Sequence, residues 1–147
     1  MSTPSHPQTS QPSAAQPLAV RLAHALSTLA AGLPNPWDES TDYFSPFHAE
    51  LPAGAALDEA TLRAALQVSS RYRLDIDGVD LDAVATDWGD EEAAAGFRLL
   101  DAVMQASLSD LCKVSARAEG VVRVRTWVVG RFASGWLVGL RTETTET

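Results

Sequence analysis

Residues 121–147 constrain the fold most strongly, because they have the pattern of a long antiparallel hairpin. Residues 122–128 alternate apolar side chains with polar or aromatic ones, at the two-residue period of a strand. Glycine and serine in residues 130–135 favour a turn, and Ser134-Gly135 is its expected tight point. A second strand then places three apolar side chains on one face: Trp136, Val138 and Leu140. The pattern predicts paired strands with one face on a core.

The sequence after this apolar pattern is unusual. Residues 142–147 are all threonine or glutamate, so every side chain carries oxygen. We expect the second strand to run off its sheet here and to present the carboxylate of Thr147 on a stiff support. Most chain ends are frayed, so a role for this end depends on what the rest of the chain places beside it.

Length and composition indicate a single globular domain. The chain has 147 residues, of which 46% are apolar, enough to bury a sizeable core. Its single cysteine, Cys112, excludes an internal disulfide and supports no zinc pattern. No apolar run reaches the roughly 18 residues that span a bilayer, and the N-terminus lacks a signal-peptide pattern. We therefore expect a cytoplasmic protein with no membrane partner.

The net charge of −8 is unevenly distributed. Residues 35–110 hold sixteen acids and four arginines, a net charge of −12, whereas residues 111–147 carry a net charge of +3. An acidic field repels nucleic acid and accelerates encounter with a basic partner. Direct nucleic-acid binding is therefore not expected, and the remaining alternatives are a basic protein partner or acidity that serves solubility alone.

The order of elements predicts an α+β fold. Residues 1–16 are rich in Pro, Ser and Gln and are expected to form a disordered tail, followed by one domain over residues 17–147. A first helix is expected from Pro17, capped by Gly32. Its predicted apolar face contains Leu18, Leu22, Ala25, Leu26 and Leu29.

The later elements follow from similar patterns. They are a short strand near residues 47–51, a helix capped by Asp58 that runs to about Val68, an edge strand over residues 71–76, a turn into a short helix, a long helix with Ala93, Phe97, Leu100, Met104 and Leu108 on its core face, and a strand over residues 111–118. Neighbouring strands with helices elsewhere indicate an α+β fold with a mainly antiparallel sheet. Helices on both faces of that sheet would bury both Trp127 and Trp136.

Two segments combine aromatic and acidic residues. Residues 33–47 form a long loop with two proline breaks, in which Asp38, Glu39 and Asp42 stand among aromatic anchors. An ordered loop of this length is often functional. The second segment contains Asp87-Trp88 just before an acidic helix start. Trp88 either folds back into the core or projects as an anchor for a partner.

The sequence lacks the residue patterns of an enzyme or a metal site. Residues 75–82 resemble a calcium loop, but glycine is fourth and the twelfth residue is Thr86, where an EF-hand needs glycine sixth and glutamate twelfth. His24 and His48 have no metal-ligand spacing, and Cys112 lies in an apolar strand pattern. We predict that the protein is not an enzyme and has no cofactor or metal of its own.

The chain from about residue 18 to Thr147 resembles the nuclease A inhibitor family, small proteins that block sugar-non-specific nucleases. The motifs that carry the resemblance, in chain order, are Gly32-Leu33, Glu39-Ser40-Thr41-Asp42-Tyr43, Asp87-Trp88 before an acidic helix, Phe97-Arg98-Leu99-Leu100, Trp127-Val128-Val129-Gly130, Gly139-Leu140, and the terminal Glu146-Thr147. Their order and spacing are more specific than any one of them.

The resemblance implies a three-layer α/β/α sandwich of the pathogenesis-related-1-like kind. It also implies that Glu39, Asp87, Trp88 and Thr147 face a nuclease, which binds as a 1:1 protein partner. The Thr147 carboxylate and hydroxyl would reach the nuclease's magnesium, which prefers hard oxygen ligands. Asp42 and Glu146 adjoin these residues and complete the expected partner-binding set.

The sequence departs from the family pattern in the first loop. This loop is about two residues longer than the family pattern, and its proline stands in Ser45-Pro46-Phe47, so Asp38 or Ser40 is an alternative to Glu39. The alternative function is an acidic protein-interaction module on the same scaffold, with a different basic partner.

Overall fold

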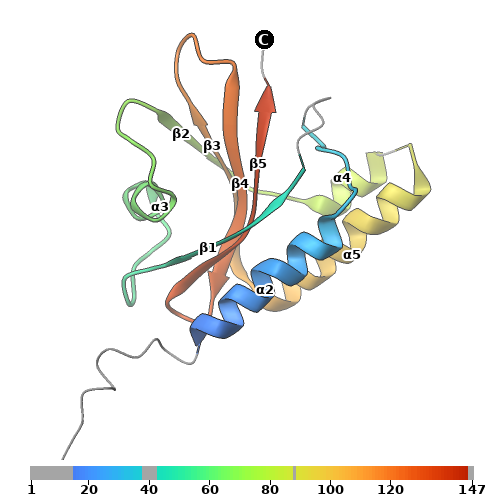
Figure 1. Cartoon of the computed structure of the whole chain (residues 1–147), viewed down its shortest axis with the longest axis horizontal. Helices are drawn as coiled ribbons and strands as arrows, with labels where there is room; N and C mark the ends of the chain where they lie inside the picture. Colours follow the sequence, from blue (N-terminus) through green and yellow to red (C-terminus); the bar gives the residue numbers. More distant parts are fainter. Residues whose placement is uncertain (1–14, 38–42, 88, 146–147) are drawn as a thin grey trace, which may run out of the picture.

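The hairpin predicted from residues 121–147 forms the centre of the fold in the computed structural model, which describes residues 15–37, 43–87 and 89–145 (Figure 1). The described elements form a mixed α+β structure with one five-stranded antiparallel sheet of order β1-β5-β4-β3-β2. The elements are α2 (Ala15–Ala30), β1 (Ser45–Glu50), α3 (Glu59–Leu66), β2 (Arg73–Asp77), α4 (Leu81–Asp87), α5 (Glu91–Ser107), β3 (Ser109–Arg117), β4 (Arg123–Phe132) and β5 (Trp136–Thr145).

The turn between β4 and β5 is shorter than the sequence suggested. We expected Gly130 to belong to the turn, but it lies within β4, paired with Val138. The structure explains why glycine stands there: a Cβ at this position would lie 2.8 Å from the Ser109 carbonyl oxygen. Gly130 therefore permits the close approach of β3, and the turn itself is confined to residues 133–135.

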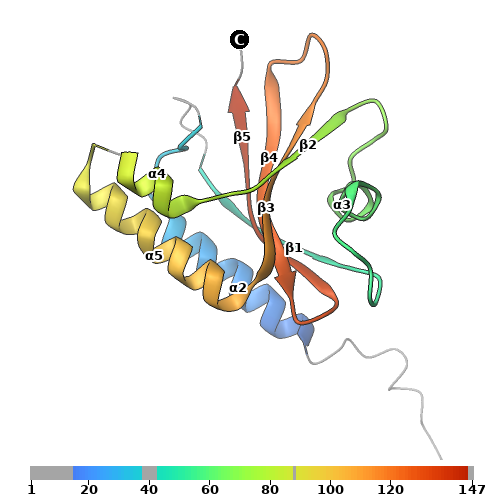
Figure 2. The same cartoon turned by 180° about the vertical axis from the view of Figure 1, so that it is seen from behind.

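Strands β4 and β5 bury one tryptophan on each face of the sheet, as predicted. Trp136 is 8% exposed and packs with the core cluster under α2, α4 and α5. Trp127 is 1% exposed and belongs to a second cluster, which contains Leu62 and Leu66 of α3. Figures 1 and 2 show α3 on one side of the sheet, with α2 and α5 on the other.

Helix α2 differs from the prediction in its start and in its buried face. It begins at Ala15, two residues before Pro17, and Gly32 follows it with a φ of +81°, the left-handed conformation that glycine adopts at helix ends. Leu18 is 51% exposed and Ala25 is also exposed. The fully buried residues are small, with one leucine: Ala19, Ala23, Leu26 and Ala30. Small side chains allow the helix to approach the sheet closely, which an apolar pattern weighted towards leucine does not reveal.

Helix α3 begins where its predicted cap places it. The Asp58 carboxylate accepts a hydrogen bond from the Thr61 amide at the start of α3, and this bond lowers the Asp58 pKa. Helix α3 ends at Leu66 rather than near Val68, because Gln67 adopts a left-handed conformation. Asp90 caps α5, whose expected core face is buried.

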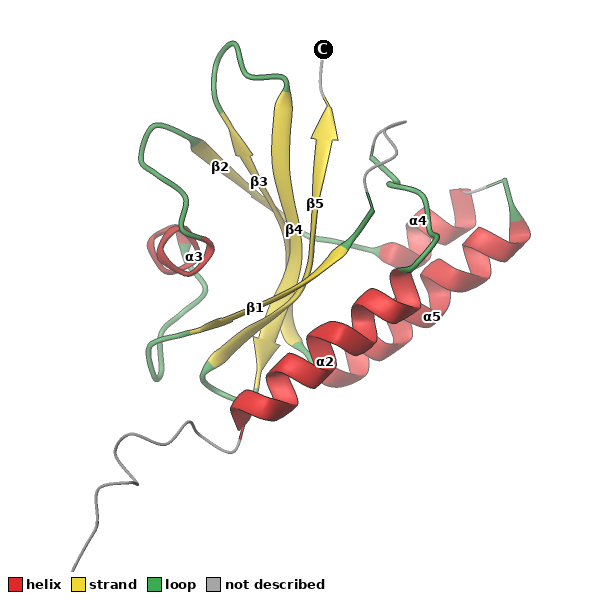
Figure 3. Cartoon of the chain, viewed as in Figure 1, coloured by secondary structure: helices red, strands yellow, loops and turns green. Residues whose placement is uncertain are grey.

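The edge strands also fit their sequences (Figure 3). β1 contains Pro46, which is tolerated in an edge strand because one side of such a strand forms no ladder hydrogen bonds. β2 forms the other edge and pairs with β3. Within the described residues, no helix combines the length and the apolar character needed to cross a membrane.

Candidate interaction site

Most of the residues predicted to bind a partner lie outside the described part of the chain. Glu39, Asp42, Trp88, Glu146 and Thr147 are not among the described residues, nor are the alternatives Asp38 and Ser40. Asp87 is described: it is the last residue of α4 and is exposed. The structure therefore bears on the site through the residues that flank these positions.

Asn35 ties the loop after α2 to the end of β5. Its side chain is 1% exposed, and its amide nitrogen donates to the Glu143 carbonyl oxygen at 3.2 Å and to Thr144 Oγ1 at 3.4 Å. Its side-chain oxygen accepts a hydrogen bond from the Trp37 amide at 3.0 Å. A buried amide with bonds of this kind fixes local geometry, because breaking them would leave polar groups unpaired away from water.

The residues on either side of segment 38–42 contact each other. The rings of Trp37 and Phe44 meet edge to face, with their centroids 6.2 Å apart. The Lys113 ammonium lies 4.5 Å from the Trp37 ring centroid, a cation–π contact from β3. Phe44 is buried in the core cluster under α2, so the chain is anchored at Trp37 and again at Phe44, one residue after the exposed Tyr43.

The end of β5 differs from the prediction. We expected the strand to leave the sheet at Thr142, but Thr142–Thr145 stay paired with residues 123–126 of β4. Thr142 and Thr144 are 5% and 3% exposed, and Thr144 Oγ1 lies 3.5 Å from Thr126 Oγ1. Threonine is β-branched and favours strands, which explains the continued pairing. The described part of β5 therefore stays in the sheet up to Thr145.

Helix α4, which ends at Asp87, packs on the same core cluster as the first loop. Leu81 and Ala85 of α4 belong to the core cluster that also contains Phe44, and Trp37 packs against it. Asp87 ends α4, and Asp90 caps the next helix three residues later. Residues that support the two aromatic-acidic segments thus belong to one core cluster, and Asn35 bonds the first of these segments to the end of β5.

The described residues contain no group of three or more His, Cys, Asp or Glu side chains placed to hold a metal ion. Burial, with a smaller contribution from Asp110, raises the pKa of Cys112 to about 11, which disfavours the reactive thiolate. The Asp75 carboxylate forms ion pairs with Arg73 at 3.0 Å and with Arg117 at 2.6 Å. One acid of the apparent calcium loop is therefore already bound to arginines.

Sequence reasoning missed Asn35 and Lys113, the residues that fix the first loop. Asn35 stands between two prolines, which marks it as part of a rigid turn but does not identify a partner 108 residues away. Lys113 is the only lysine in the sequence, and its charge alone could have drawn attention to it.

Comparison with known proteins adds no assignment. No protein-family model matches this chain, and no curated protein is significantly similar to it.

Proposed function

We propose that this protein inhibits a magnesium-dependent, sugar-non-specific nuclease by a 1:1 complex that blocks the active site. In this proposal the Thr147 carboxylate and hydroxyl reach the nuclease's magnesium, where a substrate phosphate would otherwise bind. A terminal carboxyl group with a pKa near ~3.5 is charged at neutral pH and supplies the hard oxygen ligand that magnesium prefers.

The acidic segments supply the remaining contacts. Glu39 and Asp87 pair with arginines that hold the nucleic-acid backbone in the uninhibited nuclease, because arginine and carboxylate form strong bidentate pairs. Trp88 is the aromatic anchor, and Asp42 and Glu146 complete the partner-binding set. Asp38 and Ser40 remain alternatives to Glu39 as the acidic or polar contact of the first loop.

One observation carries the proposal: Asn35 joins the acidic loop to the end of β5. Its bonds to Glu143 and Thr144 support a common surface for the first loop and the chain end. Trp37, Phe44 and α4 all pack on one core cluster, which supports a common scaffold for the first loop and Asp87. Supports on one rigid core favour simultaneous contact, since less ordering entropy is lost on binding.

The proposal also covers the fold family, the cellular location and the absence of a cofactor. We infer a three-layer α/β/α sandwich of the pathogenesis-related-1-like kind, supported by core clusters on both faces of the sheet. The protein would act in the cytoplasm as a binding protein rather than an enzyme, without a cofactor of its own. It would bind neither nucleic acid nor membranes.

The acidic contacts can be tested by titrating a magnesium-dependent non-specific nuclease with single variants. Glu39→Ala, Asp87→Ala and Trp88→Ala should each weaken inhibition, and Trp88→Ala should do so by about 2–4 kcal/mol. Asp77→Ala is a matched control, because Asp77 is an exposed acid on β2. Equal inhibition by all four variants would contradict the proposed surface. Absence of inhibition by the unaltered protein would favour the alternative, an acidic interaction module with another basic partner.

A further inference from the structure

Three arginines on one face of this acidic protein have no carboxylate partner. Arg71, Arg125 and Arg141 form no ion pair within residues 15–37, 43–87 and 89–145. Six other arginines do pair with acids: Arg63, Arg73, Arg98, Arg117, Arg123 and Arg131. Arg21 of α2 also forms no ion pair among these residues. What distinguishes Arg71, Arg125 and Arg141 is therefore that they lie together on one face of a chain with nineteen acids.

Aromatic rings hold two of these arginines in place. The Arg125 guanidinium carbon lies 5.3 Å from the centroid of Tyr72 and 5.5 Å from that of Trp127. The Arg71 guanidinium carbon lies 5.7 Å from the same Tyr72 ring. Each of these guanidiniums makes a cation–π contact and has no carboxylate of the described residues bound to its N–H groups, which can then donate to an oxyanion.

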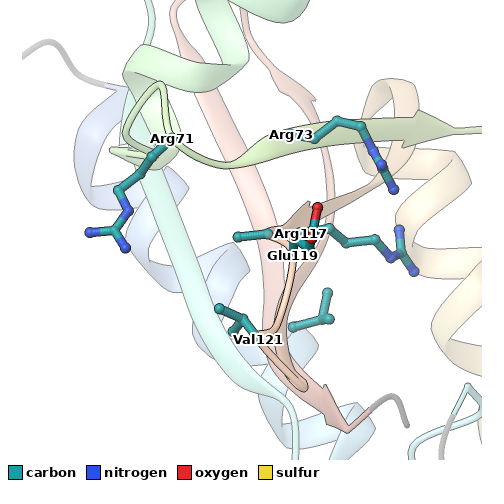
Figure 4. A pocket seen from close by; sticks show the side chains of 7 residues that line it. Arg71, Arg73, Arg117, Glu119 and Val121 are labelled. Carbon is teal, nitrogen blue, oxygen red and sulfur yellow. The ribbon is translucent and has the colours of Figure 1, made fainter.

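The sheet places the third arginine on the same face. Arg141 of β5 stands directly opposite Trp127 in the β4–β5 register. Side chains paired in this way lie on the same face of a sheet. Figure 4 shows Arg71 directed away from the neighbouring Arg73 and Arg117, which both bind Asp75. We call Arg71, Arg125 and Arg141 the arginine surface.

We propose that the arginine surface binds an acidic polypeptide segment through its carboxylates. The other arginines at this end of the sheet bind carboxylates. Arg73 and Arg117 bind Asp75, and Arg123 binds Glu143. Nucleic acid fits less well, because two guanidiniums already lie over the Tyr72 ring where a base would stack. A net charge of −8 also opposes a long polyanion. This inference does not rest on the proposed nuclease inhibition, although Arg141 lines a pocket with Tyr43 and Glu143 near the end of β5.

The test uses the full chain and a fluorescein-labelled peptide in which glutamate alternates with serine. Fluorescence anisotropy at low ionic strength should detect binding to the unaltered protein. Arg71→Gln combined with Arg125→Gln should weaken binding about tenfold, because two charge-assisted contacts are lost. The matched control combines Arg21→Gln with Arg98→Gln, two exposed arginines of α2 and α5, and should change binding less than about twofold.

A second variant separates binding from folding. Arg71 is exposed, so Arg71→Gln alone should keep the fold and still weaken binding by about threefold. Equal weakening by the two double variants would reduce the effect to net charge and overturn the assignment. Absence of peptide binding to the unaltered protein would also overturn it. Single-stranded oligothymidylate of equal charge should bind more weakly than the peptide, and equal or tighter binding would assign the surface to nucleic acid instead.

Discussion

The Asn35 side-chain nitrogen lies 3.2 Å from the carbonyl oxygen of Glu143, 108 residues later in the chain. This bond, with the one to Thr144, connects an acidic loop to the strand that leads to the chain end. Neither segment alone would define a surface. Their connection makes one interaction surface physically reasonable.

Replacing Asn35 should destabilise the protein. Asn35→Ala removes a buried donor and leaves the Trp37 amide without its acceptor, which should cost about 1–3 kcal/mol in the free energy of unfolding. Asn35→Asp keeps that acceptor but places a carboxylate oxygen against the Glu143 carbonyl oxygen, and should cost at least as much at neutral pH. Urea unfolding measures both. An Asp variant as stable as the unaltered protein would contradict the assigned orientation of the amide.

Gly139 should tolerate no side chain. A Cβ at this position would lie 1.9 Å from the Val128 carbonyl oxygen, so Gly139→Ala must displace the backbone of β4. We expect a loss of about 3 kcal/mol or more in the free energy of unfolding, at the upper end of overpacking costs. Gly78→Ala is the control, because a Cβ there meets nothing within 4 Å, and its thermal midpoint should stay close to that of the unaltered protein.

Asp75 should contribute to acid sensitivity. The hydrogen bond from Arg73, supported by Arg117, holds the pKa of Asp75 below its ordinary value. Its stabilising contribution is therefore complete above the unfolded pKa of about 3.9 and is lost as the pH falls through the lower folded value. Asp75→Asn should make unfolding free energy less dependent on pH over this acidic range. Asp77→Asn, at an exposed position of the same strand, should leave the pH dependence nearly unchanged.

Cys112 should react slowly in the folded protein. With its pKa raised to about 11 by burial, little thiolate exists at pH 8. Alkylation by iodoacetamide should be about a hundredfold slower than for an ordinary cysteine, and the normal rate should return in urea. Rapid labelling of the folded protein, measured by mass spectrometry, would show that the thiol is neither buried nor protonated to this extent.

Strand alternation and caps predicted much of the fold, because those signals are local. The hairpin, the burial of Trp127 and Trp136, and the cap at Asp58 follow from near neighbours in sequence. The end of β5 was missed because apolar alternation stops at Leu140, although threonines continue the strand. Asn35 and the arginine surface depend on partners far apart in sequence, which no periodic pattern encodes.

The most direct test of the proposed function is a nuclease titration with the chain end altered. A magnesium-dependent non-specific nuclease would be titrated with the unaltered protein, a variant lacking Thr147, and a variant extended by one glycine. We expect stoichiometric inhibition by the unaltered protein and much weaker inhibition by both variants, because each change moves the terminal carboxylate away from the metal. Equal inhibition by all three forms would contradict a role for the Thr147 carboxylate on the magnesium.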